Sequence, residues 1–154
     1  GVGAHSIEVV IACEKEGIPA DYYMKTFHHD RYWSATPIDK RIEFSIDGRF
    51  WSKDAAKQFY TGAGKRNRDD WNDIMFDLFP LKTIEVMKQV TKPWIAFKVL
   101  ASGSILPVEG FRYAFENGAD FICVGMFDFE IVENVNTVNE ILGSLGKRER
   151  EWYS

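Results

Sequence analysis

The feature that most constrains the fold is residues 94–129, WIAFKVLASGSILPVEGFRYAFENGADFICVGMFDF, where apolar runs alternate with glycine turns. The pattern predicts strand, turn, helix, strand and turn in succession, which is two consecutive βα units. Both strands are continuous apolar runs, as is typical of parallel sheets covered by helices. This stretch therefore predicts a parallel sheet that belongs to a barrel, with glycine turns at the carboxyl ends of its strands.

The same pattern extends through the rest of the chain. An initial strand ends at His5, and Ser6 is placed to cap a helix that stops at Gly17. The later strands are expected at residues 22–27, 74–76, 94–100 and from 121, and helices at 81–90 and 133–142. Five βα units result. They indicate one α/β domain, residues 1–146, with a long loop insertion at about 31–70 and a polar tail, 147–154, that is expected to fray.

Five parallel strands fit two architectures, an open doubly wound sheet or the C-terminal five units of an eight-stranded (β/α)8 barrel. Alternation along the fourth strand places Ile95 and Phe97 against helices and Trp94, Ala96 and Lys98 on the opposite face. An open sheet needs helices on both faces, so a lysine there would be costly, whereas a barrel interior near its rim accepts one. A partial barrel is therefore expected. Another chain or missing N-terminal strands would complete it, because its two edge strands need pairing.

Composition limits the partners. A chain of 154 residues with 45% hydrophobic content can bury one core, and its net charge of −4 makes a nucleic-acid surface unexpected. A small-molecule partner fits better. No apolar run of about 18 residues predicts a membrane span, and no targeting segment lies within the chain, so a cytoplasmic location is the default expectation. Cys13 and Cys123 lie in apolar surroundings and are expected to be buried thiols.

Ionisable residues gather at the expected strand ends, where barrel enzymes keep their active sites. The expected catalytic residues are Lys98, His5, His28 and Lys25. Lys98 is placed to serve as a base or imine former, and a structural ion pair with Asp77 or Asp128 is an equal alternative. Imidazole suits both proton transfer and metal binding, so His5 and His28 are candidates for either role.

Two kinds of ligand-binding group are expected at the same edge. Backbone N–H groups of the glycine turns are placed to hold an anion. The residues concerned are Ser102, Gly103, Ser104, Gly125 and Met126. The alternative is a divalent metal, such as zinc or manganese, held by His5, His28 and Asp77, although these residues lack the HxH or HExxH spacing of common metal motifs.

Two segments resemble a known family. ASGSI at residues 101–105 and NGADFICVGM at residues 117–126 resemble the last two βα units of phosphate-binding TIM barrels, in which an xGGI turn follows strand seven and a GADxxxVG run ends strand eight. Ser104 stands in place of the second glycine, and Met126 follows the last one. KPWIAFKVLASGSI, AFENGADFICVGMFDF and the initial GVGAHS are similar to TIM-barrel-like proteins of a family without an assigned activity. The resemblance implies a TIM-barrel fold.

Three functions follow as expectations. The first is an enzyme of the aldolase or isomerase type that acts on a small polar, phosphorylated or carbohydrate-like compound, with Lys98 as base or imine former and His5 or His28 as proton shuttle. The second is a metal-dependent lyase, isomerase or hydrolase. The third is a non-catalytic domain that binds a ligand or assembles with another chain.

Overall fold

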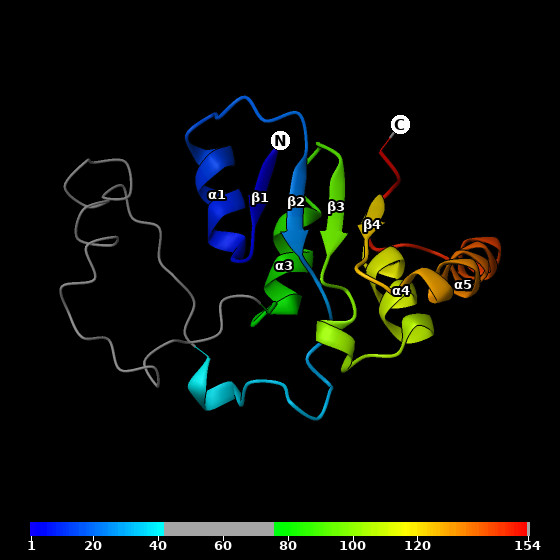
Figure 1. Ribbon diagram of the computed structural model, residues 1–154. Helices are drawn as coiled ribbons and strands as arrows, with labels where there is room; N and C mark the ends of the chain where they lie inside the picture. Colours follow the sequence, from blue (N-terminus) through cyan, green and yellow to red (C-terminus); the bar gives the residue numbers. More distant parts are fainter. Residues whose placement is uncertain (42–75, 154) are drawn as a thin grey trace.

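The structure, a computed structural model, describes residues 1–41 and 76–153. The described residues form one sheet of four parallel strands that lie side by side in chain order (Figure 1). These strands are β1 (Val2–Ala4), β2 (Tyr23–Thr26), β3 (Trp94–Phe97) and β4 (Phe121–Cys123). The expectation of an α/β fold with a parallel sheet is confirmed.

The strand expected at residues 74–76 does not join the sheet between its neighbours. Residues 74–75 lie outside the described part of the chain, and Phe76 lies in a bend. β2 pairs directly with β3, with Tyr23 opposite Trp94 and Thr26 opposite Phe97. The expected sheet of five strands in chain order was therefore wrong for the described residues. A strand at 74–76 would have to lie between β2 and β3, but β3 already pairs with β2 there. Most of the loop expected at 31–70 also lies outside the described residues.

In residues 1–41 and 76–153, four α-helices connect and follow the strands, and several of them begin at local sequence signals. They are α1 (Ile7–Lys15), α3 (Pro80–Met87), α4 (Pro107–Glu116) and α5 (Ile131–Ser144), with short 3-10 helices η1 (Ile38–Lys40), η4 (Ala101–Gly103) and η5 (Asp128–Glu130). Ser6 caps α1 by accepting a hydrogen bond from the Glu8 N–H at 3.1 Å, as the sequence predicts. No helix in the described part of the chain is long and apolar enough to cross a membrane.

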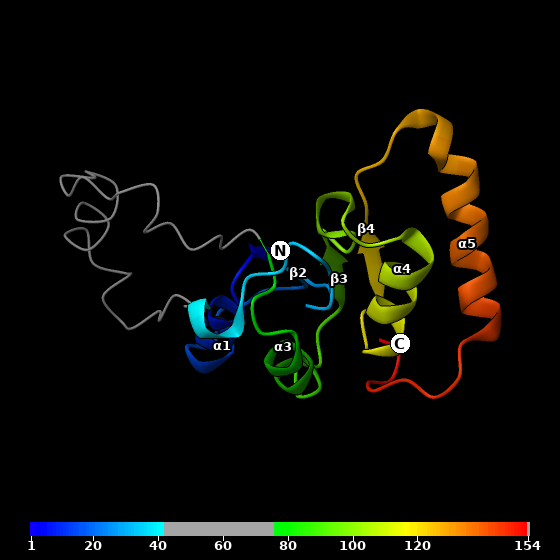
Figure 2. The ribbon, with the colours of Figure 1, turned by 90° about the horizontal axis from the view of Figure 1, so that it is seen from below.

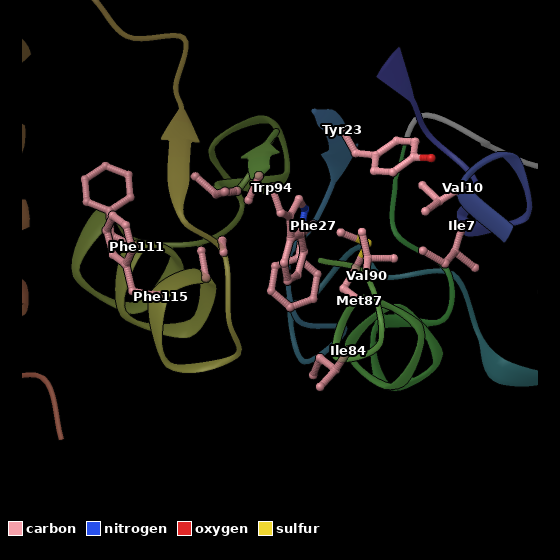
Figure 3. Packing of buried hydrophobic residues seen from close by; sticks show 14 of the residues in the cluster. Ile7, Val10, Tyr23, Phe27, Ile84, Met87, Val90, Trp94, Phe111 and Phe115 are labelled. Atoms are coloured by element: carbon pink, nitrogen blue, oxygen red, sulfur yellow. The ribbon is translucent and has the colours of Figure 1, made fainter. Parts of the chain in front are cut away.

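The helices pack against one face of the sheet. Tyr23, Trp94 and Ala96 share that face by register and are fully buried in a core with residues of α1, α3, α4 and α5. Figure 2 shows α1 and α3 on one side of β1 to β3, and α4 and α5 alongside β4. In Figure 3, Phe27 and Trp94 lie at the centre of this core, where their ring centroids are 4.8 Å apart. Within residues 1–41 and 76–153, the sheet is thus singly wound rather than covered by helices on both faces.

The expected orientation of β3 was wrong. Trp94 and Ala96 face the helices, and Ile95 and Phe97 lie on the opposite face, which we call the open face. The expectation took Ile95, Phe97 and Val99 as a smooth apolar surface for helices, and it placed Lys98 on the opposite face as a residue of the same strand. β3 ends at Phe97, and Lys98 has left-handed backbone dihedrals with φ of 56°, so its position in the alternation has no bearing on the strand.

The C-terminal tail is docked rather than frayed over residues 147–153, which corrects the expectation for this segment, and Ser154 lies outside the described residues. The Arg150 side chain donates hydrogen bonds to Asp120 Oδ2 at 2.6 Å and to the Lys92 carbonyl at 2.8 Å. The Tyr153 N–H donates to Asp120 Oδ1 at 2.8 Å. Asp120 Oδ2 also accepts the Trp94 N–H, so the tail is tied to the amino end of β3. The expectation of fraying rested on the polar character of this segment, but its arginines donate to buried acceptors.

The two cysteines differ in burial. Cys13 is buried in the core on α1, as expected. Cys123 is exposed on the open face at the end of β4, which corrects the expectation of a second buried thiol. Its neighbours are apolar in sequence, but among the described residues no helix packs on that face of the strand.

Candidate functional site

The sheet brings most of the expected site residues to its carboxyl edge, because parallel strands all end there. They separate into two groups on opposite sides of β2. Lys25, His28 and Asp77 are buried on the helix side, while His5 and Thr26 lie on the open face. The remaining candidates lie in the turns after β3 and β4: Lys98, Ser102, Gly103, Ser104, Gly125 and Met126.

Lys25 and Asp77 form a buried ion pair. The Lys25 ammonium lies 3.6 Å from Asp77 Oδ2 and donates a hydrogen bond to the Thr26 carbonyl at 2.5 Å. Asp77 Oδ1 accepts the Phe79 N–H at 3.3 Å and the Thr83 hydroxyl at 3.1 Å, at the start of α3. The pair thus ties the end of β2 to the first turn of α3. These contacts give both residues a structural role, so no catalytic role is needed to explain why a lysine and an aspartate are buried here.

His28 is held in one tautomer by the backbone. Its Nδ1–H donates to the His29 carbonyl at 2.9 Å, and its Nε2 accepts the Asp77 N–H at 3.0 Å. Burial lowers the pKa of His28 to about 4, so the ring is neutral at physiological pH. Because both ring nitrogens are occupied by the chain, His28 has no lone pair left for a metal and no accessible proton to exchange with a ligand.

His29, which the sequence left unassigned beside His28, is also a structural residue. Its Nδ1 accepts the Arg31 N–H at 3.1 Å, so the ring proton is on Nε2, which lies 2.9 Å from Glu109 Oε1 on α4. Burial, the largest effect, lowers the pKa of His29 despite this carboxylate. The contact joins the loop after β2 to α4. In the sequence, the tandem pair His28-His29 is the only feature that draws attention to His29. Nothing in the sequence indicates Glu109 as its partner.

His5 begins a row of side chains across the open face. It directly follows β1, and its Nδ1 lies 2.7 Å from the Thr26 hydroxyl on β2. Its ring packs on Phe97 of β3, with centroids 5.4 Å apart. Register places Cys123 of β4 next to Phe97. His5 therefore lies at the carboxyl edge of the sheet, oriented by a buried hydroxyl that sequence reasoning missed.

The turn after β3 has an unusual backbone. Lys98, Ala101 and Ser102 have φ of 56°, 44° and 56°, and Gly103 has φ of 84°. Non-glycine residues with positive φ are uncommon, and three within five residues indicate stored strain, which is characteristic of functional loops. The side chain of Ser104 lies 3.2 Å from the Ser34 hydroxyl, so the loop after β2 reaches this turn. Expected ligand-binding residues Ser102, Gly103 and Ser104 thus share one strained turn.

The turn after β4 has a different setting. Gly125 is exposed, and Met126 points toward α5, where Asn134 Nδ2 lies 3.5 Å from its sulfur. Met126 and Val135 line an apolar groove of about 200 Å³ between β4, α4 and α5. The Met126 side chain thus contributes to this groove, on the helix side of β4, and not to the open face.

The expected metal ligands do not gather. No group of three or more His, Cys, Asp or Glu side chains is placed to hold a metal within residues 1–41 and 76–153. Of the expected set, His28 and Asp77 are neighbours through the Asp77 N–H, while His5 lies on the other side of β2.

Comparison with known proteins adds no relative: no family model, curated protein or solved structure matches the chain.

Proposed function

We propose that this chain forms the carboxyl-terminal part of a TIM (β/α)8 barrel and carries part of a small-molecule site at the carboxyl edge of its sheet. Sequential parallel strands with helices on one face are the arrangement that a barrel requires. The open face would then be the barrel interior. Missing N-terminal strands or another chain would pair with the outer edges of β1 and β4.

The proposed activity is that of an aldolase or isomerase acting on a small polar, phosphorylated or carbohydrate-like compound. The observation that carries it is the row of His5, Thr26 and Phe97 on the open face, beside the strained turn that begins at Lys98. His5 would exchange or share a proton with the ligand, and Lys98 would act as base or imine former. Lys25 and His28 leave the catalytic set, since their contacts are satisfied within the chain.

The test is capture of a ligand by the purified chain. A panel of sugar phosphates and small hydroxy-aldehydes and hydroxy-ketones is incubated with borohydride, and adducts are located by mass spectrometry. We expect an adduct on Lys98 that Lys98→Met abolishes and that Lys15→Met, which changes an exposed lysine of α1, leaves intact. A ligand at one hundred times its Kd should also stabilise the fold by about 2.7 kcal/mol. Failure of every compound both to label Lys98 and to raise the melting temperature would contradict the proposal.

Assembly with another chain is the second candidate function. Large apolar side chains are exposed beyond the carboxyl end of β4, with Phe127 67% and Phe129 77% exposed and their rings stacked at 5.3 Å. Met126, which directly precedes Phe127, lines the apolar groove together with Val135. Sedimentation at several concentrations tests this candidate: a larger mass that Phe129→Ser reduces supports assembly, and the mass of one chain at all concentrations argues against it. No described set of ligands favours the metal-dependent alternative.

A further inference from the structure

We infer that Thr26 is a positioning residue that holds His5 in a single tautomer, with the ring proton on Nε2; its use in chemistry rests on the proposed function. Thr26 is fully buried as the last residue of β2, and its hydroxyl lies 2.7 Å from His5 Nδ1. One of the two groups must donate the proton that lies between them. The identity of the donor decides the tautomer of His5.

The contacts of Thr26 assign the donor. A threonine hydroxyl has one proton, and a buried donor needs an acceptor. His5 Nδ1 is the hydrogen-bond partner of this hydroxyl, and the Thr26 carbonyl already accepts the Lys25 ammonium. If Nδ1 carried a proton, the ring would donate to the hydroxyl, and the hydroxyl proton would be left buried without an acceptor. Thr26 therefore donates to Nδ1, and the proton of the neutral ring is on Nε2.

Packing keeps the ring in this relation to Thr26. His5 follows Ala4, which is opposite Lys25, so His5 and Thr26 are cross-strand neighbours at the end of a parallel pair. Phe97, opposite Thr26 on the next strand, contacts the ring of His5 at 5.4 Å with an angle of 39° between the planes. Strand pairing and an aromatic contact thus fix the two groups that share the hydrogen bond.

The tautomer defines what His5 can do. A neutral imidazole with a proton on Nε2 is a hydrogen-bond donor at that nitrogen, and its other nitrogen is occupied by Thr26. Such a ring stabilises negative charge that develops on a carbonyl oxygen, and it does not act as the base. In the proposed enzyme Lys98 is then the base or imine former, and His5 donates a hydrogen bond to the carbonyl oxygen of the same substrate as negative charge develops on it.

The tautomer is measured without a ligand, by nitrogen-proton correlation spectra of the imidazole rings at neutral pH. The chain has three histidines, and loss of a signal in His5→Asn assigns His5. We expect a single His5 tautomer protonated at Nε2. His28 provides an internal contrast, because its contacts require the proton on Nδ1.

Variants separate positioning from general stability. Thr26→Val should convert His5 to the mixed tautomers of a free imidazole, and Thr26→Ser should restore the single form. Thr83→Val removes another buried hydroxyl, one that contacts Asp77, and should leave the His5 signals unchanged. Protonation of wild-type His5 at Nδ1 would overturn the inference even if Thr26→Val fails to fold, and so would an unchanged tautomer in a folded Thr26→Val.

Ligand capture distinguishes this inference from the proposed function. Once a compound that labels Lys98 is known, Thr26→Val should slow labelling by about tenfold or more, and Thr26→Ser should recover the rate. Equal rates in the wild type and Thr26→Val would reject a positioning role while the proposed function stands. If no compound labels Lys98, the proposed function fails, and the tautomer measurement still decides the assignment of Thr26.

Discussion

His28 illustrates how burial sets the role of a single side chain. Sequence placed it among the catalytic and metal-binding candidates, since it follows a strand at the expected site. Its two nitrogens instead satisfy a carbonyl and an N–H of the chain, and burial holds its pKa at about 4. A histidine that stays neutral in this way contributes to stability only while it is unprotonated.

This contribution should make folding sensitive to acid. The pKa of His28 is about 4 in the fold, against about 6.5 for an unfolded histidine, so between these values the unfolded chain binds more protons. The free energy of unfolding should therefore fall as pH is lowered from about 6.5 to about 4, by on the order of 3 kcal/mol. Urea unfolding across this range measures it. His28→Gln, which retains a donor and an acceptor, should show a shallower dependence, and an identical slope would contradict the assignment.

The Lys25 and Asp77 pair is a second case at this scale. Removal of one partner of a buried ion pair typically costs about 3 to 5 kcal/mol, because the other charge stays buried. Lys25→Met should therefore lower the free energy of unfolding by about this amount, and Asp77→Asn in the same chain should recover part of the loss. Denaturant unfolding of both single variants and the double variant gives the coupling energy. Strictly additive effects would show that the two groups do not interact.

At the scale of elements, helix α4 depends on a close approach to the turn after β3. A Cβ atom at Gly110 would lie 2.6 Å from the Val99 carbonyl oxygen and 3.0 Å from Leu100 Cδ2. The helix can pack on this strained turn only because residue 110 has no side chain. The same contact holds the turn that carries Ser102, Gly103 and Ser104.

Gly110→Ala should thus destabilise the protein although alanine is the better helix former. We expect a loss of about 1 to 3 kcal/mol from overpacking. Gly143→Ala in α5 is the matched control, because apart from neighbouring backbone of its own helix no atom lies within 4 Å of the added methyl group there. It should be neutral or stabilising by up to about 1 kcal/mol. Thermal unfolding of the two variants compares them directly, and equal effects would show that α4 does not need this approach.

On the scale of the whole molecule, the docked tail packs at the amino ends of β3 and β4. Arg150 and Asp120 are nearly fully buried, and their hydrogen bonds join the C-terminus to the amino end of β3, near the carbonyls of Val90 and Lys92. Arg148 adds hydrogen bonds to the carbonyls of Phe115 and Ala119, and it stacks on the ring of Trp152. The tail is thus part of the fold.

Arg150→Met should therefore destabilise the whole domain, by about 3 to 5 kcal/mol, because the Asp120 carboxylate stays buried without the guanidinium. The control is Arg112→Met. Arg112 forms a half-exposed pair with Glu116 one turn along α4, and its loss should cost less than about 1 kcal/mol. Equilibrium unfolding in urea measures both variants. A small effect of Arg150→Met would mean that the tail is dispensable.

The sequence alone determined the parallel α/β class and the starts of α1 and α3, because these depend on local signals such as apolar runs, the Ser6 cap and Pro80 in the first turn of α3. Only the tertiary structure decided which face of β3 meets the helices, because strand alternation is symmetric until register and packing break the symmetry. It also paired Lys25 with Asp77, His5 with Thr26 and Arg150 with Asp120, residues 21 to 52 positions apart in the chain. Hydrogen bonds and burial between residues so far apart leave no local pattern in the sequence. The folded structure is therefore needed to distinguish residues with a structural role from residues that remain candidates for chemistry.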